Sequence, residues 1–297
     1  MGESAAPAAL HLTIVPREPA GGTLVRITVD RFDHADDSVI AVRGMFAGEP
    51  LHFLSDGPDK LTSLGAIPVD VSDSAVATVY VQRKSGMVDS TRTMLKYPHQ
   101  APPAPPTPQP RARARPRGAS RLHVDAKFTR AMDSATTERV ERENELARDV
   151  GRLAQETPKL WTQPFLRPRP TRITSTFGSG RVFNGRLTSS HLGIDYRGAA
   201  GEPIFAANRG VVALVDSFFL AGNVVYLNHG NGLMTGYFHM TKQEVAVGDT
   251  VERGQEIGLV GATGRVTGPH LHWSARYGTL TINPADLLSL KDPFVAK

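Results

Sequence analysis

Two short histidine motifs in the second half of the chain carry residue types that bind divalent metals. The first is HLGID at positions 191–195 and the second is HLH at positions 270–272. Residues i, i+2 and i+4 of an extended strand point to one face. We therefore expect His270 and His272 to project together from one strand, and His191 and Asp195 from another. A helix would also align His191 with Asp195, but Gly193 disfavours a helix there.

Two histidines and one carboxylate are a known ligand set for catalytic zinc, with the fourth position left to water. Imidazole nitrogen and carboxylate oxygen both suit Zn²⁺. The chain has no cysteine, which excludes disulfides, thiolate ligands and a cysteine nucleophile. If His270 is counted, the two motifs hold one ligand more than a catalytic site needs. His270 is therefore a candidate acid or base beside the metal, and His239, in the sequence YFHM, is a second.

The other histidines carry weaker signals. A single histidine in a strand is more often a surface or hydrogen-bonded side chain than a ligand, and we expect this of His229. The remaining five have no partner in the sequence and receive no role: His11, His34, His52, His99 and His123.

The sequence from Leu166 to Leu288 resembles the LytM/lysostaphin-like family of peptidoglycan zinc metalloendopeptidases. The matching segments follow the family's order along the chain. They are ITSTFG (173–178), HLGIDY (191–196), PIFAA (203–207), GVV (210–212), YFH (237–239), GDTV (248–251) and GATGRVTGPHLH (261–272). The resemblance covers less than half of the chain.

The resemblance implies an endopeptidase that hydrolyses peptide cross-bridges of bacterial peptidoglycan, with Zn²⁺ as its cofactor. It makes His191, Asp195 and His272 the metal ligands. It makes His239 and His270 the pair that orients and deprotonates water and steadies the tetrahedral intermediate, without saying which is the base.

The resemblance leaves other points open. Ser274 stands where many relatives carry an acidic residue, a departure that bears on substrate detail. The type of cross-bridge is not predicted. The alternative function is a non-catalytic cell-wall-binding or regulatory module with the same fold, and the presence of all three ligands and both further histidines argues against it.

A helix and a β-domain are expected to position these residues. The resemblance implies a small antiparallel β-domain with a groove for residues 161–297. Residues 136–156 carry an apolar stripe at helical spacing, formed by Leu146, Val150, Leu153 and Ala154, which predicts a helix within a connector at 121–160. Pro158 is expected to end it.

The first third of the chain is rich in short strand-like runs. Runs at 10–15, 23–29, 38–42 and 75–81 are separated by turn-forming residues, which predicts a small β-sandwich accessory domain over 1–97. Prolines and arginines dominate 98–120, which is typical of a semi-rigid linker. The chain is therefore predicted to be mainly β. Whether the N-terminal domain inhibits or targets the C-terminal one is left open.

Charge and hydropathy limit the partners. The net charge is +5 and the pI is about 9.6, with five arginines between Arg111 and Arg121. Because no aromatic residues interleave with them for base stacking, we expect no nucleic-acid partner; peptidoglycan stem peptides are the expected partners.

No apolar run is long enough to span a membrane and no signal peptide is recognisable. The resemblance nevertheless implies an exported protein, periplasmic or cell-wall associated. The oligomeric state is not predicted.

Overall fold

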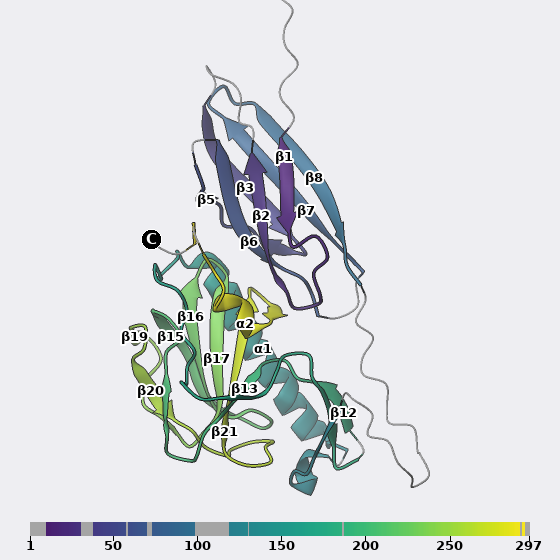
Figure 1. The fold of residues 1–297 in the computed structure, drawn as a ribbon, viewed down its shortest axis with the longest axis vertical. Coiled ribbons are helices and arrows are strands. Elements are labelled where there is room, and N and C mark those ends of the chain that lie inside the picture. Colours follow the sequence, from purple (N-terminus) through teal and green to yellow (C-terminus); the bar gives the residue numbers. More distant parts are fainter. Residues whose placement is uncertain are drawn as a thin grey trace, which may run out of the picture. The chain divides into compact units, whose positions relative to one another are not determined.

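The computed structural model describes residues 10–30, 38–57, 59–69, 73–98, 119–129, 131–185, 187–291 and 293–294. The chain divides into two compact units (Figure 1). Unit 1 comprises residues 1–100 and 290–297, and unit 2 comprises residues 101–289. The proline-rich stretch 99–118, with the arginines up to Arg117, lies outside the described residues.

Unit 1 is a sandwich of two four-stranded antiparallel sheets. The first has the order β1 (His11–Val15), β2 (Leu24–Asp30), β6 (Lys60–Ala66), β5 (Leu54–Ser55). The second has the order β4 (Glu49–Pro50), β3 (Val39–Phe46), β7 (Ser74–Arg83), β8 (Val88–Lys96). Alternate residues of each central strand face a shared core, in which Val25 and Ile27 of β2 join Val79 and Val81 of β7. This confirms a β-rich N-terminal region.

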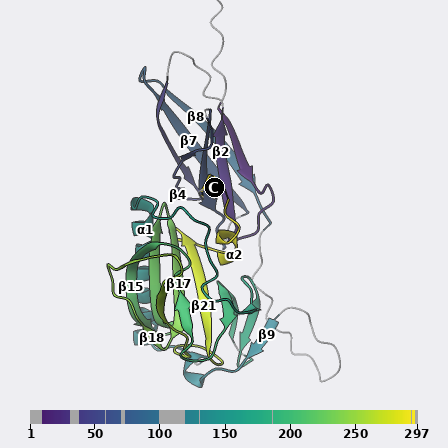
Figure 2. The same cartoon turned by 60° about the vertical axis from the view of Figure 1, so that its left-hand side comes forward.

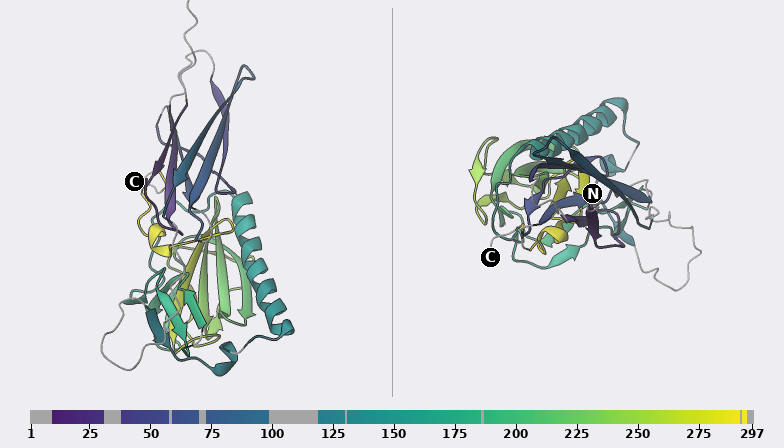
Figure 3. Two further views of the ribbon diagram at one scale, coloured as in Figure 1. Left: turned by 90° about the vertical axis from the view of Figure 1, so that its right-hand side faces the viewer. Right: turned by 90° about the horizontal axis from the view of Figure 1, so that it is seen from above.

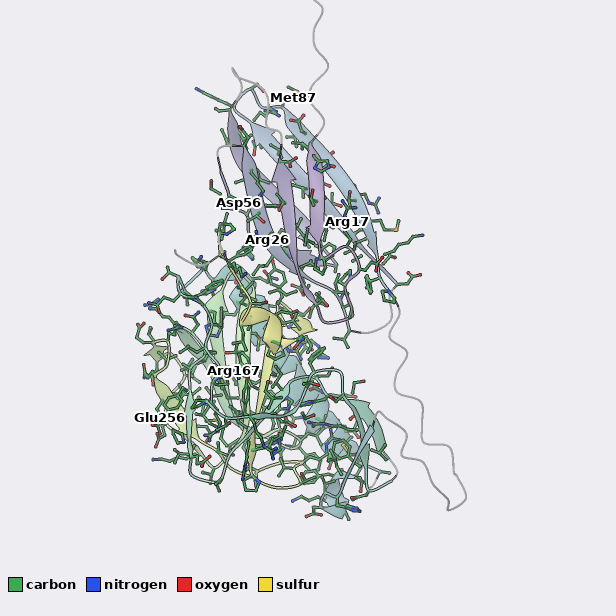
Figure 4. The ribbon with its side chains drawn as sticks, in the orientation of Figure 1. Arg17, Arg26, Asp56, Met87, Arg167 and Glu256 are labelled. Atoms are coloured by element: carbon green, nitrogen blue, oxygen red, sulfur yellow. The ribbon has the colours of Figure 1, made fainter. Side chains whose placement is uncertain are left out.

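The last described residues of the chain belong to unit 1. Phe294 is 2% exposed, and the guanidinium carbon of Arg26 lies 5.2 Å from the centroid of its ring. Arg26 is labelled on β2 in Figure 4. The expected boundaries placed everything from 161 to 297 in one domain, whereas residues 290–297 group with unit 1. A cation–π contact of this kind joins distant segments and leaves no periodic signal in the sequence.

Unit 2 is built on one large antiparallel sheet. Its strand order is β10 (Ile173–Ser175), β13 (Ile194–Arg197), β21 (His270–Tyr277), β17 (Leu233–Met240), β16 (Gly222–Gly230), β15 (Gly210–Phe218), β19 (Thr250–Val251), and β22 (Leu280–Ile282) pairs with β21. Figure 1 shows β13, β21, β17, β16 and β15 of this sheet, and Figure 2 shows β15, β17 and β21 from another side. The mainly β, antiparallel fold predicted for this part of the chain is confirmed.

Two three-stranded sheets flank the large one. The first has the order β12 (Leu187–Ser190), β11 (Gly180–Phe183), β9 (Ala119–Leu122), and β9 runs parallel to β11. The second has the order β14 (Pro203–Phe205), β20 (Glu256–Leu259), β18 (Lys242–Gln243). A short 3-10 helix, η1 (Ala126–Phe128), and a short α2 (Pro284–Leu287) complete unit 2. Strand β9, which begins at Ala119, thus adds to the β11–β12 hairpin of unit 2.

Helix α1 (Ser134–Glu156) packs along the large sheet (Figure 3). Asp133 caps its first turn, with Oδ1 accepting a hydrogen bond of 2.7 Å from Thr136 N. The predicted apolar stripe is partly wrong, because Leu146 and Leu153 are 38% and 48% exposed.

The buried side of α1 carries Glu143 and four smaller residues, which are Ala147, Val150, Gly151 and Ala154. A Cβ on Gly151 would collide with the carbonyl oxygen of Gly278, so the helix backbone lies too close to the sheet for leucine. Over the described residues, no helix combines the length and apolarity needed to cross a membrane.

Candidate metal centre

Three side-chain atoms of unit 2 converge on one point. Nε2 of His191 lies 2.9 Å from Nδ1 of His272 and 3.0 Å from Oδ1 of Asp195. The same Asp195 oxygen lies 2.9 Å from His272 Nδ1. The three residues are 1%, 6% and 8% exposed in sequence order. Among the described residues, this is the group of histidine and acidic side chains arranged to hold a metal ion.

The large sheet positions two of the three residues. Strands β13 and β21 pair so that Asp195 stands directly opposite His272, which puts both side chains on one face. On the other side of β21, Phe238 of β17 is the partner of His272, and the two rings stack with centroids 5.1 Å apart. His270 and His272 do leave one face of one strand, as predicted.

His191 does not share a strand with Asp195, contrary to the expectation. It lies in the turn between β12 and β13, where its N–H donates to Ser179 O (2.9 Å) and its carbonyl accepts from Gly178 N (2.8 Å). The turn is tight because Gly193 packs against the His272 ring. A Cβ on Gly193 would lie 2.5 Å from His272 Nε2, so the chain can pass only without a side chain.

Outer contacts fix how His191 and Asp195 present their ligand atoms. The His191 Nδ1–H donates to Thr176 O at 2.9 Å, and Ser175 Oγ lies 3.0 Å from the same nitrogen. Nε2 therefore keeps its lone pair toward the other two side chains. The second carboxylate oxygen of Asp195, Oδ2, accepts a hydrogen bond from Arg181 Nη2 on β11. Each group is held in the orientation that a metal ligand requires.

Burial and charge keep the site in a metal-binding protonation state. Burial lowers the pKa of His272 to about 4, although Asp195 acts in the opposite direction. Burial alone would raise the pKa of Asp195, but hydrogen bonds from His191 and His272 hold that pKa well below its usual range. At neutral pH the pair thus consists of a neutral imidazole and a carboxylate, which are the forms that coordinate metals.

The two further histidines meet beside this centre. His239 and His270 have ring centroids 5.0 Å apart. The His239 Nδ1–H donates to Thr263 O and the His270 Nδ1–H donates to Gly268 O, each at 2.9 Å. With Nδ1 as the donor in each ring, Nε2 is the nitrogen that remains for other contacts. His270 Nε2 is buried, lies 3.7 Å from Asp195 Oδ1, and has no hydrogen-bond partner within the described part of the chain.

His239 adopts an unusual backbone conformation at the end of β17. Its φ angle is +63°, a left-handed conformation that costs a non-glycine residue roughly 1–3 kcal/mol. Burial, with the charges of His270 and His272 adding to it, lowers its pKa well below the ordinary histidine value. His239 is therefore a neutral hydrogen-bond acceptor at physiological pH.

Two cavities touch the centre. One of about 320 Å³ is lined by Asp195 and His270 together with Arg181, Arg197 and Arg265; we call it the arginine pocket. The other, of about 170 Å³, is lined by His272 and Phe238 and by residues of α1 that include Val140 and Ala147. Helix α1 therefore covers the sheet face that bears His272 and forms a wall beside it.

The donor set fits a zinc ion. Tetrahedral zinc with bonds of about 2.0–2.1 Å separates its ligand atoms by about 3.3 Å, a few tenths of an ångström more than the observed separations. Two imidazole nitrogens and a carboxylate oxygen are also the ligand types that catalytic zinc takes. All three donors of the candidate metal centre come from this chain.

Sequence reasoning did not find the groups that orient the ligands. Ser175 and Thr176 lie within a motif that matched the family, but no role was assigned to them. Arg181 carried no signal, because β11 and β13 belong to different sheets and only the folded chain brings the Arg181 side chain to Asp195. His229 is the hydrogen-bonded histidine that was expected, and it is fully buried, with Nδ1–H donating to Arg209 O at 2.8 Å.

A mainly antiparallel β-unit with a buried group of two histidines and one aspartate agrees with the resemblance that the sequence motifs indicated. Residues 189–284 match the family model described as Peptidase family M23. Residues 189–284 therefore form a Peptidase family M23 domain, and the predicted resemblance of this part of the chain to LytM/lysostaphin-like peptidases is confirmed.

The chain is similar to two named groups of bacterial proteins over this region. It is 44% identical over 103 residues to the peptidoglycan DD-endopeptidase ShyA of Vibrio cholerae, which is 34% of this chain and 24% of that protein. It is 37% identical over 137 residues to the DD-carboxypeptidase/endopeptidase Mpg of Neisseria meningitidis, or 46% of this chain and 31% of that protein. The chain thus spans no more than about a third of the length of these relatives.

One solved structure is similar over both units. A candidate peptidase M23 from Pseudomonas aeruginosa aligns with a TM-score of 0.63 and 23% identity, covering 91% of this chain and 95% of that one. At this identity the likeness concerns the fold alone.

Proposed function

We propose that unit 2 is a zinc-dependent endopeptidase that hydrolyses peptide cross-bridges of bacterial peptidoglycan. The observation that carries the proposal is the convergence of His191, Asp195 and His272 within 3.0 Å of one another inside an M23 domain. The names of the similar proteins, a peptidoglycan DD-endopeptidase and a DD-carboxypeptidase/endopeptidase, support this substrate class. Such a substrate implies that the protein works outside the cytoplasmic membrane, in the periplasm or at the wall.

In this proposal His191, Asp195 and His272 hold Zn²⁺. The ion supplies a Lewis acid that polarises the scissile carbonyl and acidifies water. The chain's own contribution is to hold the donors ready. Thr176 O fixes the tautomer of His191, and Arg181 fixes the carboxylate of Asp195. Preorganised ligands need no rearrangement when the metal enters.

We assign proton transfer to His270 and water orientation to His239. The buried Nε2 of His270 lies 3.7 Å from the ligand oxygen of Asp195 and is an acceptor without a partner among the described residues. It takes the proton as the water oxygen attacks the carbonyl carbon, and returns it to the amine nitrogen when the C–N bond breaks. His239, whose pKa is held low by burial, stays neutral and accepts a hydrogen bond from the same water.

The test compares zinc content and hydrolysis of purified peptidoglycan for the wild-type chain, His272→Ala and His270→Ala. We expect about one zinc per wild-type chain and release of cross-link fragments. His272→Ala should lose the metal, whereas His270→Ala should keep it and lose activity by roughly 10²–10⁴-fold. His11→Ala, which changes an exposed histidine of unit 1, is the matched control and should retain both.

A wild-type chain without metal, or one that holds metal but cuts no wall preparation, would instead indicate the alternative, a wall-binding or regulatory module of the same fold. Equal losses of metal in His270→Ala and His272→Ala would contradict the division of roles.

A further inference from the structure

Arg265 of the arginine pocket is held in place by an aromatic ring. Its guanidinium carbon lies 4.3 Å from the centroid of the Phe183 ring, and Phe183 is only 2% exposed. A guanidinium over the face of a buried ring is held there by a cation–π contact. The side chain is therefore held at one place in the pocket that also contains Asp195 and His270.

The Arg265 guanidinium has no hydrogen-bond acceptor among the residues that the structure describes. Its recorded contacts are the Phe183 stack and a backbone hydrogen bond from its N–H to Leu220 O. Burial, and then the positive charge of Arg181, lower the pKa of Arg265. A partly buried charge without an acceptor is unfavourable, and a ligand that supplied one would remove that cost.

The neighbouring charges cannot satisfy Arg265. Arg181 is already engaged with Asp195 Oδ2, and Arg197 is a third cation at the pocket wall. Asp195 is the one carboxylate among the described residues that line the pocket, and under the proposed function it is also a metal ligand. The arginine pocket therefore carries an excess of positive charge even before a metal is bound.

An anionic, planar group is the complement of such a pocket. Guanidinium groups bind carboxylates through two parallel N–H···O bonds, and a stacked guanidinium keeps the geometry that this needs. The substrate class of the proposed function consists of peptides, whose anionic groups are carboxylates at a C-terminus or on an acidic side chain. A carboxylate is thus the ligand group that the pocket and the substrate have in common.

We propose that Arg265 is a specificity-determining residue that binds a substrate carboxylate in the arginine pocket, beside the bond that is cut. The inference rests on the proposed function and deepens it, because it selects cross-linked peptides that carry a free carboxylate close to the scissile bond. Arg197 contributes long-range attraction, and Arg181 remains the partner of Asp195.

The experiment uses the full chain and three synthetic cross-linked stem-peptide dimers. One carries free carboxylates, one has its C-terminal carboxylate amidated, and one has the side-chain carboxylate of its diamino acid amidated. Cleavage (kcat/KM) and binding by calorimetry are measured for wild type, Arg265→Gln, Arg265→Lys and the control Arg142→Gln. Arg142 is an exposed arginine of α1, so its loss changes the net charge without altering the pocket.

The wild-type chain should cut the free peptide about tenfold or more faster than one of the amidated peptides, since charge-assisted hydrogen bonds are stronger than neutral ones. The amidated peptide that the wild-type chain cuts more slowly identifies which carboxylate is bound. Arg265→Gln should lose about tenfold on the free peptide and nothing on that amidated peptide. Arg265→Lys should fall between them because it keeps the charge but not the fork, and Arg142→Gln should match wild type.

Equal cleavage of all three peptides by the wild-type chain would overturn the inference while leaving the proposed function intact. The same follows if Arg265→Gln loses activity equally on all three, because that indicates a structural role. If wild type cuts none of them, the proposed function fails, and calorimetry alone decides the inference. Tenfold weaker binding of the free peptide by Arg265→Gln would then support it, and equal binding would overturn it.

Discussion

Asp195 and His272 are directly opposed residues of adjacent antiparallel strands, and Asp195 Oδ1 lies 2.9 Å from His272 Nδ1. Opposed residues of an antiparallel pair have Cβ atoms about 4.5–5.5 Å apart, which is close enough for two ligands of one metal. A slip of one residue between β13 and β21 would move the imidazole to the other face of the sheet. Two of the three candidate ligands are therefore spaced by the hydrogen-bond register.

Replacing Asp195 with asparagine tests the contribution of its charge to the centre. The amide keeps the shape of the side chain but cannot supply a carboxylate between two imidazoles. We expect Asp195→Asn to bind zinc at least about 100-fold more weakly, since changing even an outer partner costs 10–100-fold. Zinc competition with a chromogenic chelator measures this. Asp149→Asn, an exposed change on α1, is the control, and equal zinc affinity in the two variants would contradict the ligand assignment.

Arg181 is expected to act as a positioning residue for Asp195. Removing its guanidinium frees Asp195 Oδ2 from its hydrogen bond but also removes a positive charge close to the metal. We expect the loss of orientation to dominate, so that Arg181→Gln weakens zinc binding by about tenfold. Arg181→Lys should lose less, because it retains a donor. The same chelator competition measures both, and tighter zinc binding by Arg181→Gln would mean that charge repulsion is the larger effect.

A methyl group at Gly193 should displace the His272 ring of the candidate metal centre. A Cβ there would lie 2.5 Å from His272 Nε2 and 2.6 Å from Trp273 O, and the second is a backbone atom that cannot move aside. We expect Gly193→Ala to destabilise unit 2 by about 1–3 kcal/mol, as overpacking does, and to lower zinc affinity.

The control for this substitution is a glycine of the segment 261–272. A Cβ at Gly268 would meet no atom within 4 Å, so Gly268→Ala should retain zinc affinity and stability. Metal analysis and chemical denaturation of the two variants give the comparison. Matching results for the two alanine variants would show that the turn at Gly193 can widen without cost.

The residues of the candidate metal centre could be predicted from sequence because they occur within short local motifs. The alternation that places His270 and His272 on one face of β21 is a property of any strand. The turn position of His191 could not be predicted, because it depends on the contact of Gly193 with a ring 79 residues later in the chain. A two-histidine motif therefore indicates which residues are candidate ligands, but it does not predict the backbone conformation that positions their side chains.

The packing of α1 shows a second limit. Its amphipathic pattern predicted a helix, and leucines marked the face expected to be buried. The structure buries small residues instead, since Gly151 meets the carbonyl of Gly278 and Leu153 is 48% exposed. Hydrophobicity alone ranks leucine above alanine, but a close helix–sheet approach selects for small volume. The partner surface decides this, and it lies on strands far away in the sequence.

His229 should make the stability of unit 2 depend on pH. The side chain is fully buried, its Nδ1–H donates to Arg209 O, and Nε2 lies 2.8 Å from Thr235 Oγ1. Burial lowers its pKa to about 4, whereas the unfolded value is about 6.5. Between these two values the unfolded chain binds a proton that the folded chain does not, so stability falls as the pH is lowered from 6.5 toward 4.

The expected loss is about 3 kcal/mol over that window, at about 1.4 kcal/mol for each unit of pKa difference. Both tryptophans, Trp161 and Trp273, are buried in unit 2, so their fluorescence during urea unfolding reports this unit. The free energy of unfolding of wild type and His229→Gln is compared from pH 4 to pH 8. His239 and His272 are common to both proteins and cancel in the difference. We expect the difference between the two proteins to be constant above pH 6.5 and to shrink below it, and parallel curves throughout would contradict a buried, neutral His229.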